Sequence, residues 1–140
     1  MLIVDAGPLY AAAARDDRNH ASCLELLATS ARPLVVPELV VTEVEYLIGD
    51  RLGAQAEARF ARSLADGEVL VEPVDPRDWP RIHELVERYL DLPLGIVDAS
   101  VVALAERLGQ DTVASLDHRH LGVVEPSHVH RLRLLPEQRQ

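Results

Sequence analysis

Residues 2–8 have the sequence Leu-Ile-Val-Asp-Ala-Gly-Pro, and this stretch decides the fold. Three consecutive apolar residues predict a short buried strand over residues 2–4. Pro8 is typical of the first position of a helix, so the chain changes from strand to helix directly after Asp5. In open α/β sheets this is the edge at which ligands bind. We therefore expect Asp5 at a ligand-binding edge, the alternative being an ordinary strand-end cap.

Strand-like and helix-like segments alternate along the rest of the chain. Further strands are predicted over residues 34–36, 68–73, 112–116 and, more weakly, 131–135. Helices are predicted over residues 8–14, 19–30, 37–52, 54–66, 75–91 and 96–108. This alternation indicates an α/β fold with a mostly parallel central sheet and helices on both faces. The length of 140 residues fits a single domain over 1–140.

The charged residues exclude several classes of function. The net charge is −9 and all 14 basic residues are arginine, so no mechanism can use a catalytic or phosphate-binding lysine. Phosphatases and receiver domains, the other Asp-centred α/β proteins considered, typically require one. An acidic chain binds nucleic acid poorly unless a local basic patch or bound cations assist it. The single cysteine, Cys23, permits no intrachain disulfide and is expected in the core.

Membrane and export signals are not evident. The amino terminus lacks a basic region before its short apolar run, which argues against a signal peptide. No apolar run approaches the ~20 residues that a membrane helix needs. We expect a cytoplasmic protein with no membrane association.

Glu43 stands out among the acids of the predicted helices. On a helix its neighbours three and four residues away are all apolar, namely Leu39, Val40, Tyr46 and Leu47. Such an acid is costly unless it is paired or binds a cation. The alternative is that Glu43 lies at the edge of the stripe with its carboxylate in water. Glu45 is expected to reach water, and most other acids, such as Glu106 beside Arg107, are expected on solvated faces.

Asp98 and Asp117 occupy positions comparable to that of Asp5. Asp98 opens the predicted helix 96–108, and Asp117 directly follows the predicted strand 112–116. Each has an ordinary explanation, a first-turn acid favoured by the helix dipole or a turn cap. Two like charges ~4 Å apart repel by ~4 kcal/mol at an effective dielectric of 20. A hard divalent cation such as Mg²⁺ relieves this repulsion, and it can activate a water for attack on a phosphodiester.

Four stretches of the chain resemble the PIN-domain family, and within it the VapC ribonuclease toxins. They are Leu-Ile-Val-Asp at 2–5, Thr-Glu-Val-Glu-Tyr-Leu at 42–47, Gly-Ile-Val-Asp-Ala-Ser at 95–100 and Ser-Leu-Asp-His-Arg-His-Leu at 115–121. Their order and spacing cover nearly the whole chain. The resemblance implies catalytic metal ligands for Mg²⁺ or Mn²⁺ at Asp5, Glu43, Asp98 and Asp117, with Ser115 as a supporting polar residue.

The same resemblance implies a function. It is that of a metal-dependent endoribonuclease, the toxin of a type II, VapBC-like toxin–antitoxin module, which hydrolyses RNA through metal-activated water. Homodimers and neutralisation by a cognate, DNA-binding, VapB-like antitoxin are implied as well. A non-catalytic PIN-like partner-binding module is the alternative, and the presence of all four acids favours the enzyme.

The RNA-contacting residues are less well marked by the sequence. His118, Arg119 and His120 follow Asp117 directly, and the two histidines are the best candidates for contact with substrate. Arg15 and Arg18 lie in the loop before residue 19. Ordinary surface charge is the favoured interpretation for most of the arginines.

Overall fold

A five-stranded parallel sheet forms the centre of the protein. The computed structural model describes residues 1–138. The strands lie in the order β3-β2-β1-β4-β5, and every neighbouring pair is parallel. Their bounds are β1 (Leu2–Val4), β2 (Leu34–Pro37), β3 (Leu70–Glu72), β4 (Thr112–Ala114) and β5 (Arg133–Leu135). The predicted parallel sheet is confirmed, including the weakly marked last strand.

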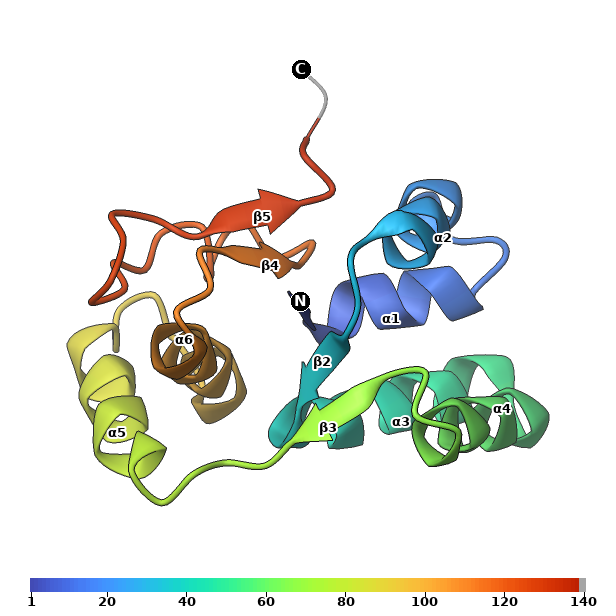
Figure 1. The fold of residues 1–140 in the computed structure, drawn as a ribbon, viewed down its shortest axis with the longest axis horizontal. Helices are drawn as coiled ribbons and strands as arrows, with labels where there is room; N and C mark the ends of the chain where they lie inside the picture. Colours follow the sequence, from blue (N-terminus) through green and yellow to red (C-terminus); the bar gives the residue numbers. More distant parts are fainter. Residues whose placement is uncertain (139–140) are drawn as a thin grey trace.

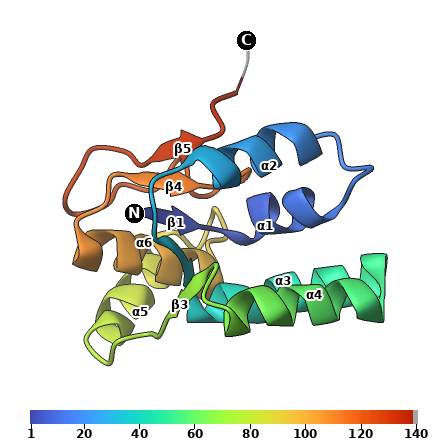
Figure 2. The same cartoon turned by 45° about the vertical axis from the view of Figure 1, so that its right-hand side comes forward.

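Helices cover both faces of this sheet, as predicted. α5 and α6 pack together on one side, and α1 to α4 lie on the other (Figure 1). Turning the molecule shows α1 and α2 stacked above the antiparallel pair α3 and α4 (Figure 2). The helices are α1 (Ala6–Ala13), α2 (His20–Thr29), α3 (Glu38–Leu52), α4 (Ala54–Ala65), α5 (Asp78–Arg88) and α6 (Ile96–Leu108).

β1 lies in the middle of the sheet. It pairs with β2 on one side and with β4 on the other, and Ile3 and Val4 are completely buried. A strand buried on both faces is expected to be continuously apolar, which explains Leu-Ile-Val. Helix α1 begins at Ala6, two residues before the predicted start, because Asp5 is extended and already serves as the N-cap. Pro8 fits inside the first turn, where a missing N–H removes no helical hydrogen bond.

α6 is the most deeply buried helix. Residues 99–105 are all buried, and all but Ser100 are apolar, so this part of the helix is enclosed on every side between the sheet and α5. Cys23 is also fully buried, which confirms its expected place in the core. No helix within residues 1–138 combines the length and the apolar character needed to cross a membrane.

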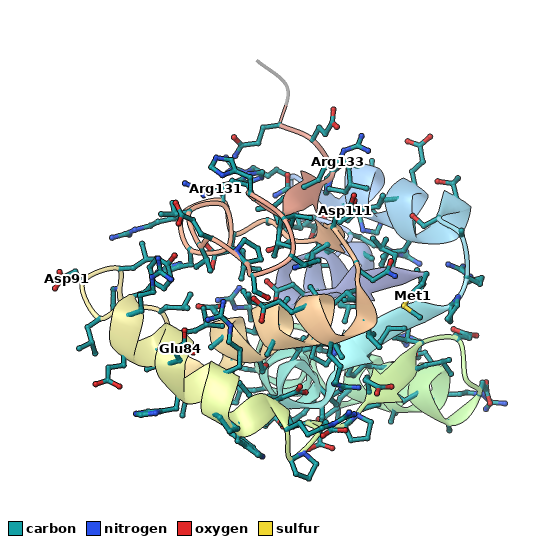
Figure 3. All side chains as sticks on the ribbon, turned by 60° about the vertical axis from the view of Figure 1, so that its left-hand side comes forward. Met1, Glu84, Asp91, Asp111, Arg131 and Arg133 are labelled. Atoms are coloured by element: carbon teal, nitrogen blue, oxygen red, sulfur yellow. The ribbon has the colours of Figure 1, made fainter. Side chains whose placement is uncertain are left out.

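Two predictions near α5 are wrong. The helix begins at Asp78 and not at residue 75, because the Asp75 carboxylate accepts the Arg77 backbone N–H at 2.8 Å and forms a separate turn. Glu106, expected on a solvated face, has a side chain only 11% exposed and lies 2.9 Å from the Arg81 guanidinium. By contrast, Glu84 and Asp91 project from the surface, as Figure 3 shows.

Candidate metal centre

The candidate site lies where the central strands end. Asp5 directly follows β1, and its backbone N–H donates to the Ala114 carbonyl at 2.8 Å. Asp117 lies three residues beyond the end of β4, the strand next to β1. Because parallel neighbours end at the same edge of a sheet, the two acids reach one place. Asp98 joins them from the first turn of α6, and Glu43 from α3.

Asp5 is the buried member of this group. Its residue is 6% exposed, and burial raises the pKa of its carboxyl from 3.8 to about 6. Hydrogen bonds from the Ala6 backbone and the Ser115 hydroxyl oppose this shift, whereas the charges of Asp98 and Glu43 add to it. A carboxyl whose pKa is raised in this way is stabilised when a cation balances its charge.

Ser115 connects two of the acids. Its side chain is completely buried, and its Oγ donates to Asp5 Oδ2 at 2.9 Å. The same oxygen accepts the backbone N–H of Asp117 at 3.0 Å. One hydroxyl therefore fixes the end of β1 relative to the loop after β4, in accord with the supporting position expected from the sequence.

His120 holds the Asp117 carboxylate. The His120 backbone N–H donates to Asp117 Oδ1 at 3.0 Å, and the ring Nδ1 lies 3.0 Å from both carboxylate oxygens. Ligand atoms of Asp98, Asp117 and His120 all lie within 4.8 Å of one another. Burial and the neighbouring Asp117 raise the pKa of Asp98, and His120 acts in the opposite direction. His120 was singled out as a substrate contact, and the structure places it against an acid of the cluster.

Glu43 reaches the cluster from outside the core. The buried positions of α3 are Val40, Val44 and Ile48, whereas Glu43 is exposed, so of the two alternatives the structure has Glu43 at the edge of the apolar stripe. Burial of its carboxyl raises its pKa, with further contributions from Asp98 and Asp117. Glu43 therefore lies near enough to Asp98 and Asp117 for their charges to act on its carboxyl.

The contrast drawn between Glu43 and Glu45 is thus reversed. Glu45 was expected to reach water, yet its Oε2 is buried and has no hydrogen-bond partner among residues 1–138. The helical spacing predicted for α3 is correct, but the predicted core-facing side of the helix is wrong, because the side that meets the core carries Val40, Val44 and Ile48. Tyr46, counted as an apolar neighbour of Glu43, is 65% exposed.

Gly122 is a positioning residue that the sequence interpretation did not identify. A Cβ at this position would overlap the backbone carbonyl of His118, so the turn after Asp117 can close only with glycine there. The turn also contains a hydrogen bond from the Leu121 N–H to the Asp117 carbonyl at 3.2 Å. His118 and Arg119 lie in this turn without joining the acid cluster, and His118 instead lines a neighbouring groove.

These contacts define a place for a hard cation. Ligand atoms of Asp98, Asp117 and His120 lie close together at this sheet edge, and Asp5, Glu43 and Asp98 all have pKa values raised partly by neighbouring acids. Oxygen donors of this kind suit Mg²⁺ or Mn²⁺ better than softer metals. The donor set fits the metal that the resemblance implies.

Comparison with known proteins identifies the class. The PIN domain model matches residues 2–125, so the chain belongs to the PIN-domain family. Within that family it is similar to the VapC toxins: Ribonuclease VapC26 of Mycobacterium tuberculosis is 33% identical over 135 residues, which cover 96% of this chain and 100% of that protein.

Two solved structures share the fold. The Mycobacterium tuberculosis toxin VapC20, described as cleaving the sarcin-ricin loop, superposes with a TM-score of 0.78 at 21% identity, over 84% of this chain and 91% of that one. PAE2754 of Pyrobaculum aerophilum has a TM-score of 0.56 at 22% identity, over 89% of this chain and 85% of that one. The predicted PIN-like architecture is confirmed.

Proposed function

We propose that this protein is the endoribonuclease toxin of a VapBC-like toxin–antitoxin module. The observation that carries the proposal is the acid cluster at the end of the central strands, where ligand atoms of Asp98 and Asp117 lie within 4.8 Å of each other and Ser115 links Asp117 to the buried Asp5. We propose that Glu43 completes this cluster. VapC relatives supply the substrate class, RNA. The carboxylate of the buried Asp5 is costly unless a cation balances its charge. This favours an enzyme over a non-catalytic PIN-like module, which has no need to retain a cluster of like-charged carboxylates.

In this proposal the four acids hold Mg²⁺ or Mn²⁺. A cation held there would supply Lewis acidity toward a phosphodiester oxygen and would lower the pKa of a water molecule. Ser115 keeps Asp5 and Asp117 at a fixed separation through its two hydrogen bonds. His120 orients the Asp117 carboxylate. Both residues reduce the reorganisation that binding would otherwise require.

We also propose a surface for the antitoxin. A hollow of about 1070 Å³ runs between the α1–α2 pair and the α3–α4 pair. Its lining includes apolar side chains such as Leu24, Leu27 and Phe60. Its charged lining has more arginines than acids, namely Arg15, Arg32 and Arg59 against Asp16 and Glu68. Such a groove suits an amphipathic segment with acidic residues beside its apolar face. We propose that a DNA-binding, VapB-like antitoxin binds here. We also propose that the toxin is a homodimer and that it is located in the cytoplasm.

The catalytic part is tested with purified, antitoxin-free protein and single-stranded RNA. We expect cleavage with Mg²⁺ or Mn²⁺ and none with EDTA. Asp98→Asn keeps the size of the side chain but removes its charge, so it is expected to abolish cleavage while the circular dichroism spectrum is retained. Asp91→Asn, at an exposed position away from the cluster, is the matched control. Equal cleavage by wild type and Asp98→Asn would contradict the site assignment.

The toxin role has a separate test. Expression of the wild type alone is expected to arrest growth, and co-expression with the neighbouring partner gene is expected to restore it. Asp98→Asn serves as the harmless control. Normal growth of cells that contain soluble, RNA-cleaving wild type would refute the toxin role without refuting the nuclease.

A further inference from the structure

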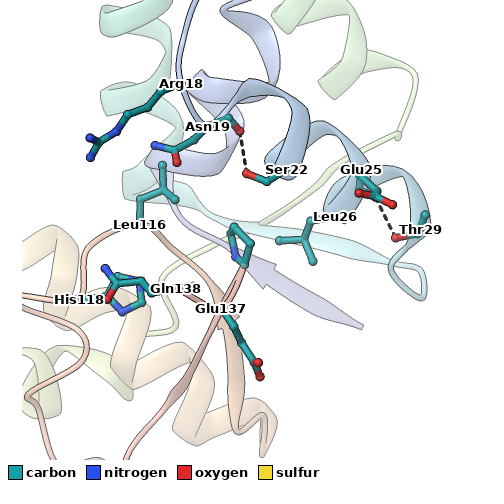
Figure 4. Close-up of a pocket in the computed structure, with 11 residues that line it drawn as sticks. Arg18, Asn19, Ser22, Glu25, Leu26, Thr29, Leu116, His118, Glu137 and Gln138 are labelled. Atoms are coloured by element: carbon teal, nitrogen blue, oxygen red, sulfur yellow. Dashed lines mark hydrogen bonds between the residues drawn. The ribbon is translucent and has the colours of Figure 1, made fainter. Parts of the chain in front are cut away.

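A second groove lies beside the acid cluster. It is a hollow of about 710 Å³ between α2 and the segment 136–138 that follows β5, as Figure 4 shows. We call it the α2–C-terminal groove. Its volume falls within the ~300–1,000 Å³ of typical small-ligand sites, which is enough for a nucleotide. None of the four clustered acids lines it.

The groove and the acid cluster adjoin the same turn after β4. Leu116 and His118 line the groove, and the residue between them is Asp117. Leu116 also lies beside Gly7, two residues after Asp5. The groove and the acid cluster therefore share this turn, so the nucleotide next to a phosphate at the acid cluster is the one that we place in the groove.

The two ends of the groove differ in charge. Arg18 and His118 line one end, and Glu25 lies toward the other (Figure 4). Glu137 also lines the groove, and its carboxylate is paired with the Arg133 guanidinium. In a chain of net charge −9, the exposed Arg18 in this groove is a local attraction for phosphate. Glu25, by contrast, disfavours a second phosphate farther along. The charge distribution therefore suits one nucleotide and not an extended strand.

The middle of the groove offers an apolar surface and an amide. Leu26, Leu116 and Pro136 provide apolar atoms against which a base can pack. Asn19 occupies the N-cap position of α2 but makes no side-chain capping hydrogen bond. Within residues 1–138 its amide has no hydrogen-bond partner, and it lies on the groove wall next to Leu116 in Figure 4. An amide can donate to and accept from the edge of a base.

We propose that the α2–C-terminal groove binds one unpaired nucleotide next to the cleaved bond of the RNA substrate. Arg18 and the His118 ring N–H contact its phosphate, Leu26 and Leu116 pack against its base, and Asn19 reads the base edge. The inference rests on the proposed ribonuclease function and adds a specificity-determining site to it. Sequence-specific recognition of RNA generally uses such unpaired, splayed bases.

The first experiment measures cleavage preference. Wild type cleaves a degenerate single-stranded RNA pool, and the product ends are sequenced. We expect a base preference at a position flanking the cut, and Asn19→Ala is expected to reduce it roughly two- to tenfold, the effect of one lost neutral hydrogen bond. Because Asn19 makes no capping bond, its removal leaves α2 intact. Arg62→Gln, an exposed arginine on α4, is the control and keeps the wild-type preference.

A second variant and a binding measurement keep the inference falsifiable. Ser22→Tyr fills the groove and is expected to weaken RNA cleavage mainly through KM. A 4-thiouridine RNA, bound to Asp98→Asn in EDTA and irradiated, is expected to crosslink to peptides containing Asn19 or Leu116. If the protein cleaves no RNA but crosslinks form at these peptides, the ribonuclease function is refuted and nucleotide binding in the groove is supported. Unchanged preference in Asn19→Ala together with an unchanged KM in Ser22→Tyr, or crosslinks only elsewhere, would overturn the inference.

Discussion

Removal of the Asp5 charge is expected to stabilise the metal-free protein. The pKa of Asp5 is raised from 3.8 to about 6, chiefly by burial. At neutral pH the ionised carboxylate therefore destabilises the folded state by about 3 kcal/mol relative to a carboxyl with the ordinary pKa. Asn has nearly the same shape and can still accept the Ser115 hydrogen bond. Asp5→Asn is thus expected to be more stable than wild type, opposite to most substitutions of buried residues.

The stability of the wild type is expected to fall as the pH rises. Between the two pKa values the folded protein binds more protons than the unfolded chain, so the wild type loses stability as the pH rises from about 4 to about 6. Below the unfolded pKa the penalty is absent, and above about 6 it is complete. The advantage of Asp5→Asn is therefore expected to be near zero at pH ~3.5 and greatest at pH ~7.5.

The measurement is urea unfolding at both pH values in EDTA, followed by circular dichroism. Asp91→Asn, at an exposed loop position, controls for the loss of one negative charge and is expected to change little. Mg²⁺ is expected to stabilise the wild type by mass action and Asp5→Asn much less. A stability difference between Asp5→Asn and wild type that is the same at both pH values, or that favours wild type at pH ~7.5, would refute the electrostatic argument.

Two further predictions concern the scaffold. Gly122→Ala is expected to weaken Mg²⁺ binding measured by calorimetry, since the new Cβ displaces the turn that holds Asp117, and unaltered affinity would show that the turn can adjust. Glu106→Gln is expected to lower the free energy of unfolding by ~2–4 kcal/mol, because it removes a mostly buried partner of Arg81. Glu84→Gln, which removes the exposed partner of the same arginine, is expected to cost below ~1 kcal/mol, and equal costs in urea unfolding would contradict the role of burial.

The sheet could be predicted because each strand has a recognisable sequence pattern. An uninterrupted run such as residues 2–4 identifies a strand buried on both faces, and alternation with helices fixes the parallel arrangement. The approach of Asp5 and Asp117 follows from the same logic, since both come shortly after neighbouring strands. Local sequence was sufficient to place a residue wherever its position depends only on where a strand ends.

Side-chain environments were predicted less well, because they depend on tertiary neighbours. Glu106 was assigned to solvent from its neighbour in the sequence, yet its partner is Arg81, 25 residues away. The core face of α3 is likewise selected by the helices and strands packed against it, which reversed the environments of Glu43 and Glu45. The need for glycine at position 122 could not be predicted from the neighbouring sequence, because it arises from the close approach of the His118 carbonyl in the folded turn.

The central position of β1 has a consequence for biosynthesis. β1 is made first, but it needs β4 as its second neighbour, and Ile3 pairs with Val113. At ~5–20 residues per second the ribosome takes roughly 5 to 20 s to synthesise the intervening chain. Until then one edge of β1 lacks its native partner, and Asp5 lacks both Ser115 and Asp117. A nascent chain released before residue 117 therefore cannot complete the acid cluster, whatever else of it has folded.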